Sequence, residues 1–419
     1  TFNFGTITNN TNLDKAFAIQ NIGANAAVLS ISSISLSGPN AAEFSIQTSP
    51  TVFNVNGGDS NNVSVRFTPT TAGAKTATLT ITSNDPDENP YTITLNGTGQ
   101  LPPPKISITQ AAINYNTSST FNYGSKKVNS NNDTVFILKN IGGQPLSYTG
   151  TPVVGGTNAA DFSIFSINPI VTSIPAGDSV AVTVRFKPSS TGLRVANISI
   201  PTNDPVTNNY VLNLNGTGIA PDIDIKQNAV AIANTGSFNF GSINTSSFLD
   251  KVFDIKNTGN DTLFLTNGSF SGTNASDFSF QNSTTATIAP NATYNLTIRC
   301  TPGASGSRTA KCNLTSNDPD ENPFEINLSA AGSLAIIGVK QNATTIANAG
   351  NFNFGTSIIN TGNGKSFTIE NTGTDTLKFN GSSITGTNSA DFTTSTNFNT
   401  LFVTPSSSVN FTITFTPTS

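Results

Sequence analysis

The sequence predicts an all-β protein, built as a tandem array of four similar β-sandwich domains of which the first and the last are incomplete. Three observations support this prediction: the composition, phrases that return along the chain, and a period-two pattern within each copy. Charged residues make up only 10% of the 419, His, Met and Trp are absent, and there are 34 Gly and 22 Pro. Such a composition is poor in helix formers and favours short strands joined by turns.

The internal repeat is visible in four phrases that keep their order. FNFG or FNYG begins at residues 2, 121, 238 and 352, a period of roughly 115 residues. An N-x-G phrase follows, then G-x-N-x-x-D/E-F, then VRFTP or a close variant. A period this long makes each copy a whole domain. The predicted domains, called repeats 1 to 4 below, are residues 1–100, 101–218, 219–333 and 334–419.

Within each repeat, short runs alternate apolar and polar side chains. Residues 63–67 read VSVRF and, after a turn, residues 77–81 read ATLTI. We expect these two runs to form a half-buried hairpin. About seven such runs per repeat, separated by Gly, Asn, Asp and Pro, predict an immunoglobulin-like sandwich of two antiparallel sheets.

The first and last repeats lack strands that the others contain. Repeat 1 begins at TFNFG, without the strand that later repeats supply as KISITQ, DIDIKQN and IIGVKQN, and repeat 4 stops at FTPTS. An open sheet edge invites pairing with another strand. We expect the same covalent chain to continue, with strand completion between subunits as the alternative.

The shared phrases resemble those of the bacterial choice-of-anchor D repeats, which are similar to hydin-type and PapD-like immunoglobulin domains. This resemblance covers nearly the whole chain. It implies a secreted or surface-anchored bacterial protein with stalk, adhesive or scaffolding duties, and it implies no catalytic residues.

Composition also limits the function. A net charge of −4 and a pI near 4.8 leave no basic footprint for nucleic acid. Without histidine, His-based triads, bases and metal ligands are excluded. No apolar run is long enough to span a bilayer. We therefore expect no enzyme, no catalytic residues and no cofactor.

The function that fits best is a structural or adhesive region of an extracellular or cell-surface protein, forming a stalk or fibre. Its expected partners are further repeats of the same chain or identical subunits, with a surface receptor or glycan as a further possibility. The alternative is a carbohydrate- or protein-binding accessory module of a secreted enzyme, although sugar platforms usually need Trp or Tyr faces.

The phrase SNDPDENP occurs at residues 83–90 and again at 316–323. Its acids are weak calcium candidates: Asp85, Asp87, Glu88, Asp318, Asp320 and Glu321. Repeat 2 has TNDPVTNN in this place, so the fold does not need the acidic pair. Asn-Asp-Pro is a turn signal in its own right, and the turn is the favoured interpretation, with calcium left open.

A second recurring acid stands at Glu43, Asp161, Asp277 and Asp391. Each lies three residues after an asparagine, which is the spacing of a helix N-cap with an acid at N3. We expect a single capped helical turn in every repeat.

The two cysteines both belong to repeat 3. Cys300 replaces Phe67 of repeat 1 and Cys312 replaces Leu79. If the two runs form a hairpin, these residues are cross-strand neighbours within disulfide reach. We expect a disulfide, with a pair of small buried hydrophobic residues as the alternative.

Four Asp-Ser/Thr-apolar triplets resemble a short bacterial O-glycosylation signal. The candidate acceptors are Thr134, Ser179, Thr262 and Thr376. Asp-Thr is also good turn chemistry, and this alternative is favoured.

Overall fold

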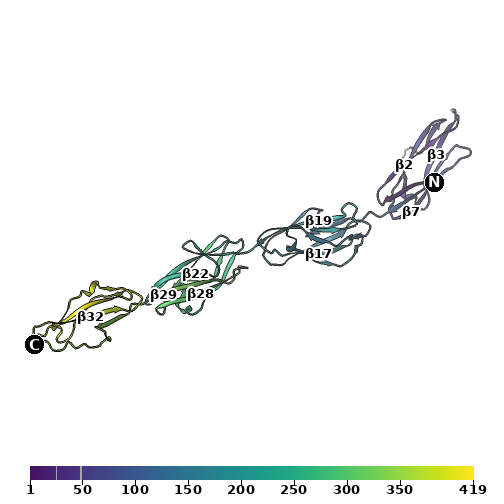
Figure 1. Ribbon diagram of the computed structural model, residues 1–419. Helices are drawn as coiled ribbons and strands as arrows, with labels where there is room; N and C mark the ends of the chain where they lie inside the picture. Colours follow the sequence, from purple (N-terminus) through teal and green to yellow (C-terminus); the bar gives the residue numbers. More distant parts are fainter. Residues whose placement is uncertain (25, 48–49) are drawn as a thin grey trace. The chain divides into compact units, whose positions relative to one another are not determined.

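The computed structural model describes residues 1–24, 26–47 and 50–419 and confirms the predicted all-β fold (Figure 1). The chain forms two compact units, Thr1–Gly218 and Ile219–Ser419. None of the described helices is long and apolar enough to cross a membrane. The predicted limits of the four repeats stay a prediction.

Repeat 1, in the first unit, has two sheets. The five-stranded sheet has the order β1(Phe2–Thr8), β8(Tyr91–Gln100), β7(Gly73–Ser83), β3(Val28–Ser37), β5(Phe53–Asn56). The three-stranded sheet has the order β2(Leu13–Gln20), β6(Ser60–Phe67), β4(Phe44–Ile46). β1 runs parallel to β8, and the neighbouring strands pair antiparallel.

Repeat 2, in the same unit, is more complete. One sheet has the order β10(Ile113–Tyr115), β9(Ile106–Gln110), β12(Asn132–Asn140), β17(Ser179–Phe186), β15(Phe162–Asn168). The second has the order β11(Thr120–Lys127), β19(Asn209–Ile219), β18(Gly192–Pro201), β14(Val153–Gly155). A small ribbon joins β13(Leu146–Ser147) to β16(Ser173–Ile174).

The second unit holds repeats 3 and 4. In repeat 3 one sheet has the order β21(Val230–Ile232), β20(Ile223–Gln227), β23(Leu249–Asn257), β27(Thr293–Cys300), β25(Phe278–Phe280). The second sheet has the order β22(Gly236–Asn244), β29(Phe324–Ser333), β28(Gly306–Ser316), β24(Leu263–Ser271), β26(Ala286–Ile288). In repeat 4 the sheets are β31(Thr344–Ile346), β30(Ile337–Gln341), β32(Asn363–Asn371), β36(Ser408–Phe415), β34(Phe392–Thr394) and the ribbon β33(Leu377–Lys378), β35(Phe402–Val403).

The predicted hairpin between residues 63–67, which lie in β6, and residues 77–81, which lie in β7, is wrong. β6 pairs with β2 and β4, whereas β7 pairs with β8 and β3, so the turn between them carries the chain from one sheet to the other. The alternation itself is confirmed. Val63, Val65 and Phe67 are fully buried. A period-two pattern shows only which side of a strand is buried, and both connections satisfy it.

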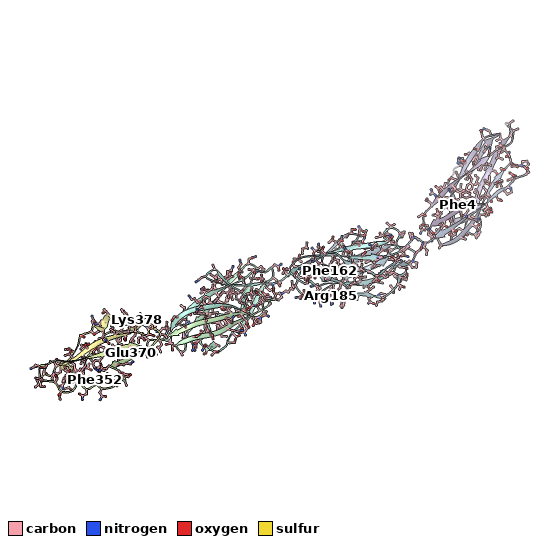
Figure 2. All side chains as sticks on the ribbon, in the orientation of Figure 1. Phe4, Phe162, Arg185, Phe352, Glu370 and Lys378 are labelled. Atoms are coloured by element: carbon pink, nitrogen blue, oxygen red, sulfur yellow. The ribbon has the colours of Figure 1, made fainter. Side chains whose placement is uncertain are left out.

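A pair of stacked rings lies in the core of each of the first two repeats. Phe44 and Phe67 have ring centroids 4.7 Å apart, as do Phe162 and Phe186 (Figure 2 labels Phe162). A Cβ at Gly97 would lie 2.4 Å from the ring of Phe67. Gly97, the first glycine of the phrase NGTG at residues 96–99, is therefore required by this ring.

Repeats 1 and 4 lack strands among the described residues, as predicted. Repeat 1 has no described counterpart of β9, and a groove of about 360 Å³ lies along β2, between Ile19, Ile31 and Ile93. Repeat 4 has no described counterpart of β28 or β29. Its described buried hydrophobic residues are few: Phe367, Ile369, Phe398 and Val403.

Candidate functional site

The N-x-G phrase forms a buried clamp on the linker that leads into repeats 2, 3 and 4. Asn257 is completely buried. Its Nδ2 donates to the carbonyl oxygens of Asp261 and Ile288 at 2.8 and 2.9 Å. Its Oδ1 accepts from the backbone N–H groups of Gly259 and Asp222 at 3.0 and 3.3 Å. One asparagine thus makes hydrogen bonds to the turn at Asp261, to the end of β26 at Ile288 and to the linker at Asp222.

The glycine of the phrase lets the linker approach the turn. A Cβ at Gly259 would lie 2.4 Å from the carbonyl oxygen of Ala220, and this distance is too short for any side chain at position 259. Backbone bonds then hold the linker: the N–H of Thr258 donates to Asp222 at 2.7 Å and the N–H of Asn260 to Ala220 at 3.0 Å. The linker is therefore docked as an extra backbone ladder.

The same linker clamp recurs in repeats 2 and 4. Asn140 accepts from the N–H of Lys105 at 3.4 Å, and Asn371 accepts from the N–H of Ile336 at 3.2 Å. A Cβ at Gly142 or Gly373 would lie 2.2 or 2.1 Å from a linker carbonyl oxygen. From the sequence, the N-x-G phrase was interpreted only as a marker of the repeats. Its presence in all four copies was a signal that the glycine makes a close backbone contact.

The SNDP loop provides a second hold on the same segment. Asp318 is 2% exposed, and its Oδ2 accepts from the N–H of Ile223 at 2.8 Å. Its Oδ1 accepts from the N–H groups of Asp320 and Glu321 at 3.1 and 3.2 Å. The first residue of β20 is therefore anchored by a carboxylate.

Repeat 2 shows that this arrangement is a turn that does not need the acidic pair. Asp204 accepts from Ile106, and also from the N–H groups of Val206 and Thr207. The loop of repeat 1 is built likewise, with Asp85 accepting from Asp87 and Glu88 at 3.1 Å. These bonds support the turn interpretation of the SNDP phrase.

In repeat 3 the linker adds a carboxylate to the loop. Carboxylate oxygens of Asp222, Asp318 and Glu321 lie within 4.8 Å of one another. Burial, followed by the charges of Asp318 and Asp222, raises the pKa of Glu321. A hydrogen bond to Asp318 is the main cause that raises the pKa of Asp320. Calcium takes six to eight oxygens, so these residues could be only part of a site, and calcium binding stays a prediction.

The predicted helical turns exist, as single 3-10 turns at Ala41–Glu43, Ala159–Asp161, Ala275–Asp277 and Ser389–Asp391. The side-chain cap is wrong in all four, because no capping asparagine bonds its own turn. In repeats 1 to 3 the asparagine bonds the facing strand instead. Oδ1 of Asn274, for example, accepts from the N–H of Thr309 at 2.9 Å.

The acids at the end of these turns form buried ion pairs that sequence reasoning missed. Asp277 pairs with Arg308 at 2.5 Å, and Asp161 pairs with Arg194 at 3.4 Å. In repeat 4, Asp391 accepts from the hydroxyl of Thr418 at 2.8 Å. The sequence did contain a signal for these pairs. A basic residue stands two positions after a turn glycine in each of repeats 1 to 3: Lys75 after Gly73, Arg194 after Gly192 and Arg308 after Gly306.

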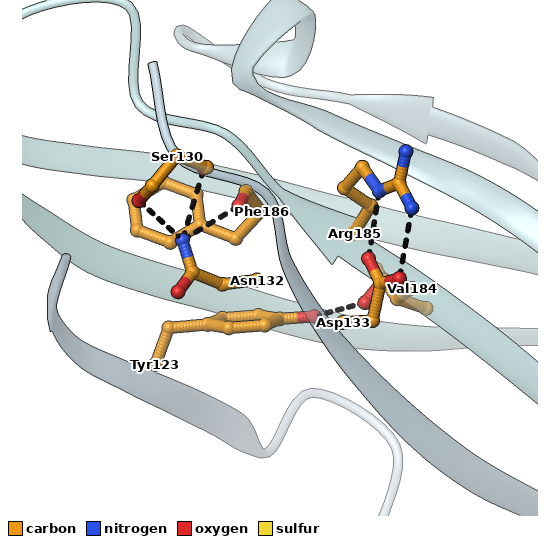
Figure 3. A network of polar contacts seen from close by, with 7 residues as sticks. All are labelled: Tyr123, Ser130, Asn132, Asp133, Val184, Arg185 and Phe186. Atoms are coloured by element: carbon orange, nitrogen blue, oxygen red, sulfur yellow. Dashed lines mark hydrogen bonds and ion pairs between the residues drawn. The ribbon is translucent and has the colours of Figure 1, made fainter. Parts of the chain in front are cut away.

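A second set of ion pairs lies on the outer face of the other sheet. Arg185 donates from Nε and Nη2 to both oxygens of Asp133, at 2.7 and 2.8 Å (Figure 3). These bonds lower the pKa of Asp133. The guanidinium also lies 3.8 Å from the centre of the exposed Phe165 ring. Beneath the pair, the Tyr123 hydroxyl donates to the carbonyl oxygen of Val184 at 2.9 Å.

The predicted disulfide is wrong. Cys300 and Cys312, both described and the only cysteines of the chain, are buried free thiols. Cys300 lies on β27 and Cys312 on β28, in opposite sheets, so the two are not cross-strand neighbours. Cys300 has a packing role. It stands where repeat 1 has the ring of Phe67, and Ala330 stands where repeat 1 has Gly97, the glycine that this ring requires.

The candidate glycosylation sites differ in exposure. Ser179 is exposed at the start of β17, whereas Thr134, Thr262 and Thr376 are half-buried. The N–H of Thr376 donates to its neighbour Asp375 at 2.7 Å, which is the turn chemistry of the alternative. Glycosylation stays a prediction.

Sandwiches of two sheets with the same two sets of ion pairs in repeats 1 to 3, and the linker clamp in repeats 2 to 4, define an array of immunoglobulin-like domains. The family model described as HYDIN/CFA65/VesB-like, Ig-like domain matches residues 1–98, 111–217 and 232–331. The chain belongs to this family. No curated protein matches the chain.

Several solved structures are similar to parts of the chain. The VesB protease of Vibrio cholerae is 16% identical, over 27% of this chain and 31% of that chain, with a TM-score of 0.21. The PapD-like domain 7 of human CEP192 is 16% identical, over 29% and 89%, with a TM-score of 0.20. Protocadherin Gamma B2 extracellular cadherin domains 1-5 are 11% identical, over 99% and 72%, with a TM-score of 0.34. The family assignment depends on the family model, since these scores are low.

Proposed function

We propose that this chain is a non-enzymatic stalk of a secreted or surface-anchored bacterial protein, of the choice-of-anchor D kind. The observation that carries the proposal is the linker clamp. In repeats 2, 3 and 4 the linker is held by a buried asparagine and by a glycine that no side chain can replace. A chain that transmits force or spacing from repeat to repeat needs such a docked linker, whereas independent binding modules do not.

Surface chemistry agrees with this proposal. Charges are few, and each of the first three repeats has one bidentate Arg–Asp pair on an outer sheet face. The partners that follow from it are further repeats or identical subunits, which meet through these weakly charged faces.

The proposal is tested by loosening one clamp. In Gly259→Ala, the added Cβ forces the linker away from its turn. We expect faster hydrogen exchange at Ile223–Gln227 and a smaller maximum dimension in solution scattering. Gly23→Ala is the matched control, because a Cβ there would meet only Asn21 Oδ1 at 3.1 Å and Ala27 Cβ at 3.3 Å. A wild-type chain with freely jointed repeats in scattering would contradict a stalk.

Location needs its own test. Protease treatment of intact source cells should release fragments of the chain if it is exposed at the surface. Full protection until the cells are lysed would contradict the proposed location.

A further inference from the structure

One end of the repeat 1 sandwich contains a buried cluster that the other repeats lack. Lys75 is 7% exposed, and its Nζ lies 2.9 Å from Oε1 of Glu43. Repeats 2 and 3 have Arg194 and Arg308 at this position. A lysine amine can act as a nucleophile once it loses its proton, which a guanidinium in a protein does not do.

An asparagine accompanies this lysine in repeat 1 alone. Asn9 follows β1, where repeat 2 has Val128 and repeat 3 has Thr245. It is 7% exposed, and its Oδ1 has no hydrogen-bond partner among the described residues. A buried polar atom without a partner is costly, so it calls for an explanation.

The amide and the amine border the same residue, Thr71. A Cβ at Gly99 would lie 2.7 Å from Oδ1 of Asn9 and 2.3 Å from the carbonyl oxygen of Thr71. Nζ of Lys75 donates to Oγ1 of Thr71 at 2.5 Å. Lys75 also faces Gly97 across the strand pair, and Gly99 follows two positions later on the same side. Both groups therefore lie beside Thr71 at this end of the sandwich.

Glu43 completes the cluster. Its Oε1 accepts from Thr70 Oγ1 at 3.2 Å and pairs with Lys75, while its Oε2 is buried without a hydrogen-bond partner among the described residues. This end of the sandwich thus holds an amine, an amide and a carboxylate that can carry a proton between the two. The burial of Lys75 and Asn9 keeps water away from them, which favours reaction between the amine and the amide.

We propose that Lys75 and Asn9 become joined by an intramolecular amide bond, with Glu43 as the proton carrier. Glu43 accepts a proton from the Nζ ammonium, and the neutral amine attacks Cγ of Asn9. The Cγ–Nδ2 bond then breaks as Glu43 returns the proton to Nδ2. Nζ gives up two protons in all, and both leave on the departing nitrogen as ammonium. The step needs no oxidant, metal or cofactor.

The bond would fasten the end of β1 to β7. β1 is the parallel edge strand of its sheet, paired on one side with β8. An edge strand held by one ladder is the first to separate under tension or on heating. A covalent link between Asn9 and Lys75 prevents that separation.

The test is intact mass spectrometry of the denatured full chain, followed by a tryptic map. We expect a mass about 17 Da below that of the sequence, the mass of ammonia. The map should contain one branched peptide with Asn9 and Lys75, and no cleavage after Lys75. A full mass with normal cleavage after Lys75 overturns the proposal.

Two variants separate this bond from other losses of ammonia. Lys75→Arg keeps an ion pair of the kind seen at Arg194 and Arg308, and should have the full mass. Glu43→Gln should have the full mass at the same age of sample. Succinimide formation at a site such as Asn96-Gly97 also loses ammonia, but it would persist in Lys75→Arg and would overturn the assignment. The wild-type map decides even if a variant misfolds.

Discussion

The carboxylate of Asp318 accepts a hydrogen bond of 2.8 Å from the backbone N–H of Ile223, a residue 95 positions earlier. The same oxygen pair also accepts two N–H groups of its own loop. A loop near the end of the repeat thus holds the first strand in place. Asp204 and Ile106 repeat this bond at 2.9 Å in repeat 2.

Asp318→Ala should therefore destabilise repeat 3. The substitution removes the acceptor of one buried N–H group, that of Ile223, and of two part-buried ones, those of Asp320 and Glu321, at a cost of about 2 to 4 kcal/mol. Denaturant unfolding of the full chain, with hydrogen exchange at Ile223–Gln227, measures the loss. Asp85→Ala is the control in repeat 1, where no described first strand pairs with the loop. Equal losses in both variants would contradict an anchoring role for Asp318.

A second prediction concerns pH. Burial and neighbouring carboxylates raise the pKa of Glu321. The folded protein therefore binds more protons than the unfolded chain between the ordinary glutamate pKa and the raised one. Stability contributed by the protonated form is lost as pH rises through this window. Glu321→Gln should then raise the Tm of repeat 3 at pH 7, by roughly 1 to 3 °C, with no gain below the ordinary pKa.

The matched control for this variant is Glu88→Gln, the same loop position in repeat 1, where no described residue takes the place of Asp222. Thermal unfolding at pH 7 and at pH 4 in the presence of EDTA separates charge repulsion from any effect of a bound cation. A lower Tm for Glu321→Gln at pH 7 would show that the carboxylate stabilises the fold.

The sequence predicted the fold class because strand alternation and turn residues are local signals. Which strands share a sheet was not predictable from them. Residues 63–67 and 77–81 have the pattern of a hairpin, yet β6 pairs with β4 and Phe67 stacks on Phe44, which is a long-range contact that alternation does not show. The same error produced the disulfide prediction. The ion pair of Asp277 with Arg308 needed three-dimensional contacts to be found.

A third prediction compares the two sets of ion pairs in repeat 3. Arg308→Ala removes the partner of Asp277, which is 6% exposed, and leaves a buried carboxylate unpaired. Arg299→Ala breaks an exposed pair with Asp250, and exposed pairs contribute little. Arg308→Ala should therefore lower the denaturant midpoint of unfolding several-fold more than Arg299→Ala does. High salt should reduce the loss of stability caused by Arg299→Ala and leave the loss caused by Arg308→Ala almost unchanged.

The same comparison has a pH form. Hydrogen bonds from Arg299 lower the pKa of Asp250. A lowered carboxyl pKa contributes stability above the unfolded value, which is lost as pH falls through the folded value. The difference between wild type and Arg299→Ala should therefore vanish in acid. A difference that persists below pH 2 would contradict an electrostatic origin.

The last prediction concerns the two thiols. Burial raises the pKa of Cys300 to about 11 and that of Cys312 to about 12. Because the thiolate is the reactive form, neither cysteine should react with a maleimide in the folded protein at pH 7. In denaturant without reductant, both should react, giving two labels per chain. Cys312→Leu, which restores the residue at Leu79 of repeat 1, should give one label and keep the fold. Labelling that requires prior reduction would show that a disulfide joins the two residues after all.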